Sequence, residues 1–219
     1  MKKNLLIWLL FLCCIILVWC CNHKDSQYYP TNDFYNMKSN WSLHILSHYK
    51  SFQQTEEYSC GCAAVLSVFD YYWIDGYDEM SICESIWASE LTWTSPDWII
   101  SFIDEIWLKH FNHTGDDNHF STPEDFEDYI IVKIDSWFVT LVDWLDWWWH
   151  WQVIIWIDTM GTEDVYDDVL IMADPYDTTD HNQDWYYVVS LARFFYMWEE
   201  GSFTETKYKQ PFITIFPMW

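Results

Sequence analysis

The residues around position 60 have the types and spacing that thiol-based acyl transfer requires. Cys60 stands at the start of a segment with helical spacing of apolar residues, and Ser59 can cap that helix. The exposed N–H groups and positive dipole end of a helix start stabilise a thiolate, the nucleophilic form of cysteine. Gly61 would let a substrate backbone approach closely. The alternative is that Cys60, like Cys62, is a small buried apolar residue.

An oxyanion donor can also be identified upstream of the cysteine. Gln54 lies six residues before Cys60 and carries a side-chain amide. Together with the Cys60 N–H, this amide could donate to the negative charge that develops on an attacked carbonyl oxygen. Two alternatives stay open, because Gln53 could be the donor instead and Gln54 could be an ordinary surface residue.

His150 and Asp174 complete a candidate catalytic set. Residues 151–157 and 168–173 have the composition of two strands and flank an acidic loop at 158–167, which predicts an antiparallel hairpin. If the pairing is symmetric about that loop, His150 lies directly opposite Asp174, within hydrogen-bonding reach. A carboxylate there would orient the imidazole of a nucleophile–His–acid triad. The alternative is a structural His–Asp pair at the mouth of the hairpin.

Helices are expected in the first half of the domain and strands in the second half. Helical periodicity and helix-start residues predict helices at 60–72, 80–88, 96–106, 122–134 and 190–198. β-Branched and aromatic runs predict strands at 138–142, 151–157, 169–173 and 212–216. A polar loop rich in His and Asp is expected at 111–122. This order predicts an α+β domain whose helices and strands are segregated.

Composition excludes several classes of partner. Among the 219 residues, Asp and Glu number 34 and Lys and Arg number 10, so the net charge of −24 argues against nucleic acid and anionic lipid surfaces. No CxxC pair or HExxH helix is present, so neither a metal nor another cofactor is expected. A solvated loop is preferred over a weak metal site for His110, His113 and His119. The three cysteines outside the N-terminal region are too few for a disulfide framework.

The N-terminal residues predict export. Lys2 and Lys3 precede an apolar run, and we expect residues 1–20 to be a signal peptide. Cys20 sits where a bacterial lipoprotein signal places its lipidated cysteine, so anchoring at Cys20 and simple secretion are both kept as hypotheses. Residues 21–49 are expected to be a tether and lead-in, and residues 50–219 to be one catalytic domain that acts as a monomer.

The order Gln54, Cys60-Gly61, His150 and Asp174-Pro175 resembles the bacteriocin-processing (double-glycine leader) peptidases, which have a papain-like fold. The resemblance covers about residues 50–217. It implies Cys60 as nucleophile, His150 as general base and acid, Asp174 as the residue that orients His150, and Gln54 as oxyanion donor. No ATP-binding motif or multi-span segment accompanies these residues, so the stand-alone form is implied and cleavage after a Gly-Gly leader is not carried over.

Tryptophan stands where the family pattern has small residues. The chain has 18 Trp and only 5 Gly, and average usage would give roughly three times as much Gly. Trp148 and Trp149 precede the predicted catalytic His, and Trp19 precedes Cys20. Our hypothesis is that many Trp residues are Gly in the natural protein, through a UGA codon that some bacteria read as Gly. The other sites with this pattern are Trp73, Trp93, Trp107, Trp137, Trp156 and Trp185.

The leading functional hypothesis is therefore an exported cysteine peptidase that hydrolyses peptide bonds through an acyl-enzyme. An alternative from another class is a catalytically inactive peptide-binding module on the same fold. A third hypothesis, carbohydrate binding by surface aromatic residues, rests on the tryptophans alone. Each of the first two hypotheses has a peptide or protein as its partner.

Overall fold

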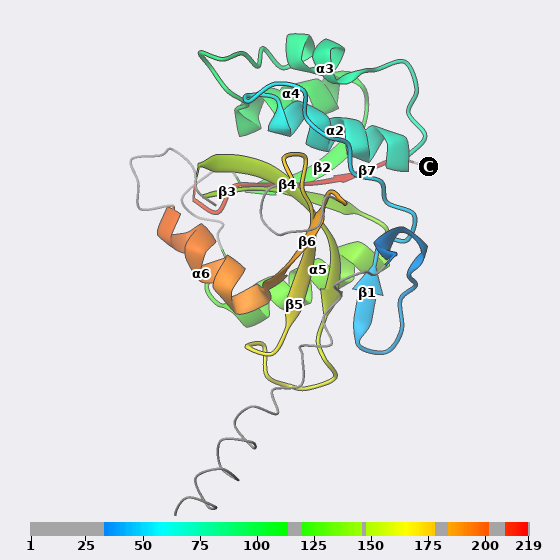
Figure 1. The fold of residues 1–219 in the computed structure, drawn as a ribbon, viewed down its shortest axis with the longest axis vertical. Helices are drawn as coiled ribbons and strands as arrows, with labels where there is room; N and C mark the ends of the chain where they lie inside the picture. The colour runs from blue at the N-terminus through cyan, green and yellow to red at the C-terminus, as the bar shows by residue number, and fades with distance from the viewer. Residues whose placement is uncertain (1–32, 114–119, 146–147, 178–183, 202–208, 219) are drawn as a thin grey trace, which may run out of the picture. The chain divides into compact units, whose positions relative to one another are not determined.

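The strands form one antiparallel sheet (Figure 1). A computed structural model describes residues 33–113, 120–145, 148–177, 184–201 and 209–218. The sheet order is β2-β7-β3-β4-β5-β6, and β1 pairs with β4 outside this path. The strands are β1 (Leu43–Ile45), β2 (Lys109–His113), β3 (Val139–Leu145), β4 (Trp149–Asp158), β5 (Val169–Ala173), β6 (Tyr186–Ser190) and β7 (Phe212–Phe216).

Helices cover the sheet on two sides (Figure 1). The helices α2, α3 and α4 gather on one side, where α2 packs on β4. On the other side, α5 packs on β3 and β4, and α6 packs on β3 and β6. The bounds are α2 (Cys60–Tyr71), α3 (Glu79–Ser85), α4 (Pro96–Glu105), α5 (Pro123–Asp135) and α6 (Leu191–Gly201), and a short 3-10 helix η1 covers Phe34–Asn36.

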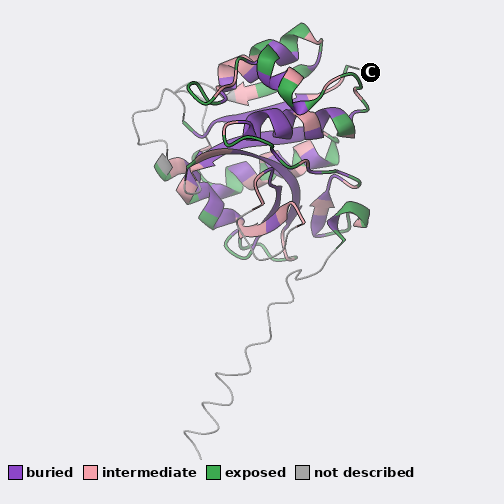
Figure 2. Cartoon of the chain, turned by 45° about the horizontal axis from the view of Figure 1, so that its top comes forward, coloured by how far each residue is buried: buried purple, intermediate pink, exposed green. Residues whose placement is uncertain are grey.

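The core lies where α2 meets the sheet. Ala64, Val65, Val68 and Phe69 recur at helical spacing along α2, and all four are fully buried. Figure 2 shows the same pattern as buried residues along α2 and through the strands. Every residue of β5 is buried as well, as expected for a strand covered on both faces. The α+β class is thereby confirmed, and the site lies at the start of the best-buried helix.

Most of the expected elements are present, and the misses are short strands. The polar loop expected at 111–122 was partly wrong, because Lys109–His113 forms β2 and pairs with β7. The strands β1 and β6 were not predicted. β1 lies in the segment expected as a tether, where Leu43–Ile45 pairs with the end of β4. Two of these strands have three or five residues with mixed polar composition, which is too short for alternation to be recognised.

The N-terminal predictions fall outside the part of the chain that the structure describes. The expected signal peptide at 1–20, including the lipidation candidate Cys20, belongs to the residues that are not described. Within the described ranges, no helix is long and apolar enough to cross a bilayer.

A disulfide bond joins Cys62 in α2 to Cys83 in α3. The two Cα atoms are 5.4 Å apart and the residues are separated by 21 positions in the sequence. The sequence argued only against a disulfide framework, and this single bond between neighbouring helices was not predicted. Among the described cysteines, Cys60 alone keeps a free thiol.

Candidate active site

Cys60 is the first residue of α2 and is almost fully buried. As the first residue of a helix, it has a backbone N–H without an intrahelical acceptor, and it lies at the positive end of the helix dipole. Ser59 is the N-cap, but its side chain makes no capping bond to the helix. Instead, the Ser59 hydroxyl donates to the Glu56 carbonyl and accepts from the Glu56 N–H. The predicted capping role was wrong, and Ser59 fixes the loop that leads into Cys60.

His150 and Asp174 form a short hydrogen bond. The distance from His150 Nε2 to Asp174 Oδ1 is 2.6 Å, and the Asp174 side chain is 2% exposed. Asp174 also accepts from the Tyr176 backbone N–H at 2.8 Å. Because Nε2 is engaged with Asp174, the other ring nitrogen of His150, Nδ1, is the one available to the Cys60 thiol. Interactions with Cys60 are among the causes that raise the pKa of His150, so the thiol lies within interaction range of the ring.

The hairpin register that predicted this contact was wrong, although the contact is present. Near its turn, β4 pairs with β5 as Asp158 with Val169, and a register shift follows between Ile154 and Trp156. Beyond that shift Val153 faces Ala173, so the position opposite Asp174 is that of Gln152 rather than His150. His150 and Gln152 are two apart and share a face of the strand. Asp174 therefore reaches His150 as a diagonal neighbour.

The ionisation of the His–Asp pair follows from its mutual contact. Burial alone would lower the pKa of His150, but its hydrogen bond to Asp174, its interaction with Cys60 and the charges of both residues raise the pKa to about 10. Burial would raise the pKa of Asp174, yet the hydrogen bond and charge of His150 hold that pKa below its usual value. At neutral pH the pair is an imidazolium and a carboxylate. An imidazolium beside a cysteine is the partner that a thiolate needs.

Gln54 lies beside this triad in a buried position. Its backbone N–H donates to the Pro175 carbonyl at 2.9 Å, which ties the loop before Cys60 to the segment after Asp174. Its Nε2 donates to the carbonyls of Glu56 (2.8 Å) and Glu57 (3.3 Å). Its Oε1 is buried without a hydrogen-bond partner among the described residues. The oxyanion role of Gln54 stays a prediction, because its donors are directed to the loop itself.

Gly61 has a packing role, and the approach of a substrate backbone there stays a prediction. A Cβ atom at Gly61 would overlap Thr94 and come within 3.0 Å of the Trp151 ring. The Trp151 indole N–H donates to the Thr94 carbonyl at 3.0 Å, so these two side chains are held in place. Gly61 thus permits close packing of α2 against β4, which sets Cys60 near His150.

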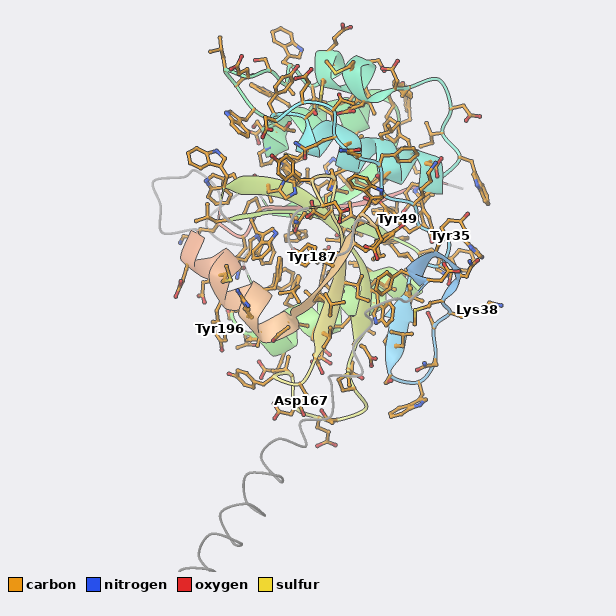
Figure 3. All side chains as sticks on the ribbon, viewed as in Figure 1. Tyr35, Lys38, Tyr49, Asp167, Tyr187 and Tyr196 are labelled. Atoms are coloured by element: carbon orange, nitrogen blue, oxygen red, sulfur yellow. A yellow bond between two sulfur atoms is a disulfide. The ribbon has the colours of Figure 1, made fainter. Side chains whose placement is uncertain are left out.

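Two residues near the triad were not identified from the sequence. Asp143 in β3 is buried, and its Oδ1 has no hydrogen-bond partner among the described residues. Burial raises the pKa of Asp143 to about 7, although the charge and the backbone of His150 act in the opposite direction. Gln152 is fully buried and accepts from the hydroxyl of Tyr187, which Figure 3 labels, at 2.6 Å. A polar residue inside each apolar strand was the available indication.

No metal centre is found in the described residues. None of their His, Cys, Asp and Glu side chains gather into a group of three that could hold an ion. His110 instead contacts Asp104 at 3.2 Å and Asn112 at 2.8 Å. His119 lies outside the described residues, and of His113 the structure describes only its backbone in β2.

Comparison with solved structures identifies the fold. The peptidase domain of Streptococcus ComA, a bifunctional ABC transporter of a quorum-sensing pathway, matches with a TM-score of 0.50 at 18% identity, over 78% of this chain and 100% of that one. A double-glycine motif protease from an AMS/PCAT transporter, in complex with its leader peptide, matches with a TM-score of 0.50 at 12% identity, over 77% of this chain and 91% of that one. No protein-family model and no curated protein matches the sequence.

These likenesses define the class of the domain. The chain has the papain-like fold of double-glycine peptidase domains, as the motif order indicated. The identities of 18% and 12% establish the fold and leave the chemistry to be argued from the site itself.

Proposed function

We propose that the protein is an exported cysteine peptidase that hydrolyses peptide bonds with Cys60, His150 and Asp174. The observation that carries this proposal is the position of His150, which bonds Asp174 at 2.6 Å and interacts with Cys60, the one free thiol of the described cysteines. That thiol lies at a helix start, where a thiolate is stabilised. The fold of double-glycine peptidase domains supports the same assignment.

The proposed reaction has two halves, which are acylation of Cys60 and hydrolysis of the resulting thioester. The Cys60 thiolate attacks the scissile carbonyl carbon, so that a C–S bond forms and the oxygen becomes an oxyanion. The C–N bond then breaks, and the leaving amine takes the proton of the His150 imidazolium. In the second half neutral His150 removes a proton from water, whose oxygen attacks the thioester. The C–S bond breaks, the acid product leaves, and the thiolate and imidazolium are restored.

The fixed groups around the triad determine how the charge is handled. The Cys60 backbone N–H is the first donor to the oxyanion, because it has no intrahelical acceptor. Gln54 becomes the second donor if one of its amide hydrogens leaves the loop carbonyls when substrate binds. Asp174 keeps the imidazole oriented with Nδ1 toward Cys60.

Peptides are the substrate class that we propose, and the cell envelope or the exterior is the proposed location. One solved neighbour holds a leader peptide, which supports a peptide-binding cleft on this fold. The Cys62–Cys83 disulfide supports an oxidising compartment. The basic and apolar start of the sequence supports export, with lipid anchoring at Cys20 as an additional proposal. We propose that the enzyme acts as a monomer.

The test combines thiol labelling with peptide cleavage by the full-length protein purified in detergent. We expect iodoacetamide to alkylate Cys60 selectively at pH 6, as located by peptide mass spectrometry, because a thiolate–imidazolium pair is reactive where a free thiol is protonated. We expect a peptide library to be cleaved, and Cys60→Ala to abolish cleavage. Slow labelling of Cys60 at pH 6 together with an uncut library would refute the peptidase assignment.

A catalytically inactive peptide-binding module is the second candidate. It is favoured by the bonds of Gln54, whose Nε2 is directed to the carbonyls of Glu56 and Glu57. Peptides that bind the wild-type protein and the Cys60→Ala variant equally well, without being cut, would support this candidate.

A further inference from the structure

A concavity lies between the segment that leads into Cys60 and the segment that follows Asp174. Its volume is about 400 Å³, and it is lined by Gln53, Gln54, Thr55, Glu56, Glu57, Pro175 and Tyr176. One wall is the loop that leads into Cys60, and the other is the segment that follows Asp174. The backbone hydrogen bond from Gln54 to Pro175 joins the two walls. The concavity is therefore a fixed neighbour of the catalytic residues.

The position of Tyr176 indicates which part of a substrate would enter. The Tyr176 and His150 rings lie edge to face, with centroids 6.2 Å apart. In the proposed reaction His150 protonates the leaving amine, so the leaving part of the peptide passes on the His150 side. The residue that follows the scissile bond is thus the substrate residue nearest to the concavity.

The lining has the chemistry of a cation-binding subsite. Glu56 and Glu57 bring two exposed carboxylates, and the Tyr176 hydroxyl donates to both oxygens of Glu57 at 3.2 Å. Gln54, which is 8% exposed, adds a buried acceptor, since its Oε1 has no hydrogen-bond partner among the described residues. No Lys or Arg lines the concavity. A Lys or Arg side chain of a substrate would supply donors for these acceptors and a charge for the carboxylates.

We propose that this concavity selects substrates with Lys or Arg immediately after the scissile bond. The proposal rests on the proposed peptidase function, and it specifies the substrate class of that site. The charge of the whole chain favours the same substrates, because a net charge of −24 attracts basic peptides.

The test uses three peptides that are identical except for Lys, norleucine or Glu after the scissile bond. We expect kcat/KM to fall at least tenfold from Lys to norleucine and further for Glu. The Glu56→Gln/Glu57→Gln variant should lose most of the preference for Lys. Glu163→Gln is the matched control, because Glu163 is also an exposed acid but lies in the turn between β4 and β5, away from the triad.

Binding of the same peptides to Cys60→Ala separates this proposal from the proposed function. If the Lys peptide binds Cys60→Ala at least tenfold more tightly than the Glu peptide does, the subsite is supported even when the wild-type protein cuts none of the peptides. Equal kcat/KM values, or equal binding to Cys60→Ala where nothing is cut, would overturn the subsite. A Lys preference that Glu163→Gln removes as fully as the double variant would also overturn it.

A second inference comes from the ends of the helices. Each of α2, α3, α4 and α5 is followed, one residue past its C-cap, by a tryptophan with a left-handed backbone. The φ angles are +55° at Trp73, +57° at Trp87, +67° at Trp107 and +61° at Trp137. The next residue donates back to the last helical turn in every case, as Ile74 to Phe69, Ala88 to Cys83, Leu108 to Ile103 and Phe138 to Lys133.

This hydrogen-bond pattern is the Schellman motif, whose left-handed residue is usually glycine. A Cβ atom is unfavourable in that conformation, and a side chain is tolerated when other contacts compensate. Here the four indoles are 72–83% exposed, so burial contributes little compensation. Trp93 and Trp185 also have positive φ angles, of +55° and +68°.

Other tryptophans are buried, in environments that suit a large aromatic side chain. Trp144, Trp151 and Trp198 are at most 3% exposed, and each indole N–H has a hydrogen-bond acceptor. Trp156, which was expected to be one of the misplaced residues, is fully buried in β4 and packs edge-on against Phe34. The described tryptophans therefore include two groups with opposite environments, one exposed with a left-handed backbone and one buried.

We infer that the six left-handed positions are glycine in the natural protein. Their codon would be UGA, read as Gly where the gene is expressed, whereas the buried group would have UGG. The six are Trp73, Trp87, Trp93, Trp107, Trp137 and Trp185. The gene sequence tests this directly, and UGG at these six codons, or UGA at Trp144, Trp151 and Trp198, would overturn the inference.

A protein-level test uses the four helix ends. We expect Trp→Gly at positions 73, 87, 107 and 137 together to raise the melting temperature by several degrees. Trp→Ala at the same four positions is the matched control, because alanine removes the indole but keeps the Cβ atom. A rise as large for alanine as for glycine would contradict the inference, since the indole rather than the backbone would then be the cause.

Discussion

Two buried aspartates flank β5, and their surroundings push their carboxyl groups in opposite directions. Asp168 directly precedes the strand and Asp174 directly follows it. Asp174 faces the imidazole of His150, and its pKa is lowered. At the other end, which the labelled Asp167 marks in Figure 3, burial and the neighbouring carboxyl of Glu127 raise the pKa of Asp168 to about 7.

The difference shows that burial alone does not decide the charge of a carboxyl group. Asp168 and Asp174 are 2% and 1% exposed, so desolvation acts on both. The partner decides the outcome, because a cation compensates for the lost water and a second carboxyl does not. The charge of Glu127 and its interaction with the Asp168 carboxyl both raise the pKa of Asp168, so the two carboxyls are best described as a pair.

The largest expected effect is on activity at the Asp174 end. We expect Asp174→Ala to lower kcat by about 10²–10⁴-fold, because His150 would lose the acceptor that orients its ring. Asp174→Asn should recover little of that loss, since the amide can hold the ring in place but lacks the charge that stabilises the imidazolium. Steady-state cleavage of a library-derived peptide measures both variants.

The matched control is Asp168→Asn, for which we expect kcat within about twofold of the wild-type value, since β5 separates it from the triad. If Asp174→Ala retained full activity, the two aspartates would not differ in role, and Asp174 would be a structural partner of His150.

The second prediction concerns stability, and its sign differs between the two ends. Because the pKa of Asp168 is raised in the folded protein, Asp168 favours the folded state at low pH. This contribution is fully present below about pH 4 and is lost as pH rises to about 7. Asp168→Asn stays neutral, so we expect it to raise the free energy of unfolding by on the order of 2 kcal/mol at pH 8 and by little at pH 4. Urea unfolding at the two pH values measures this.

Asp174→Asn should act in the opposite direction. Because the pKa of Asp174 is lowered in the folded protein, Asp174 stabilises the fold at pH values above the pKa of the unfolded state. This contribution is lost as pH falls through the pKa of the folded state. Its replacement leaves the buried imidazolium without a counter-charge, so we expect a loss of about 1–3 kcal/mol at pH 8. Equal shifts for Asp168→Asn and Asp174→Asn at pH 8 would break the comparison.

The contact of Asp174 could be predicted from the sequence, whereas that of Asp168, at the other end of β5, could not. Asp174 could be identified because the Asp-Pro pair follows a strand whose hairpin partner begins near His150, and residue spacing alone brings them close. The register was wrong because the turn is not symmetric: Ile157 pairs with Leu170 rather than with Asp167, an error of three positions that the shift between Ile154 and Trp156 reduces to two. The contact survived because residues two apart share a face.

Asp168 could not be identified, because its partner comes from another layer. Glu127 is on α5 and meets Asp168 only when that helix packs on the sheet. The short strands β1 and β2 were not predicted for a related reason, since they gain their stability from pairing with distant strands. The disulfide was missed because the separation of Cys62 and Cys83 says nothing about the angle between their helices.

A third prediction concerns Asp143, a buried carboxyl that shares features with both Asp168 and Asp174. Asp143 has the same cation nearby as Asp174, yet burial still raises its pKa to about 7, because the charge and the backbone of His150 offset only part of its desolvation. We expect Asp143→Asn to lower kcat/KM by about tenfold or less and to flatten its change between pH 6 and 8. A pH profile parallel to that of the wild type would exclude this positioning role.

The smallest expected effect is a coupling energy at the Asp168 end. Glu127→Gln should stabilise the protein at pH 8 for the same reason as Asp168→Asn, since either change removes one of two adjacent carboxylates. The double variant should gain less than the sum of the single variants, by about 1 kcal/mol, because the repulsion can be removed only once. Urea unfolding of the four proteins at pH 8 completes the cycle. Strict additivity would mean that the two carboxyls do not interact, and burial alone would then have to account for the raised pKa of Asp168.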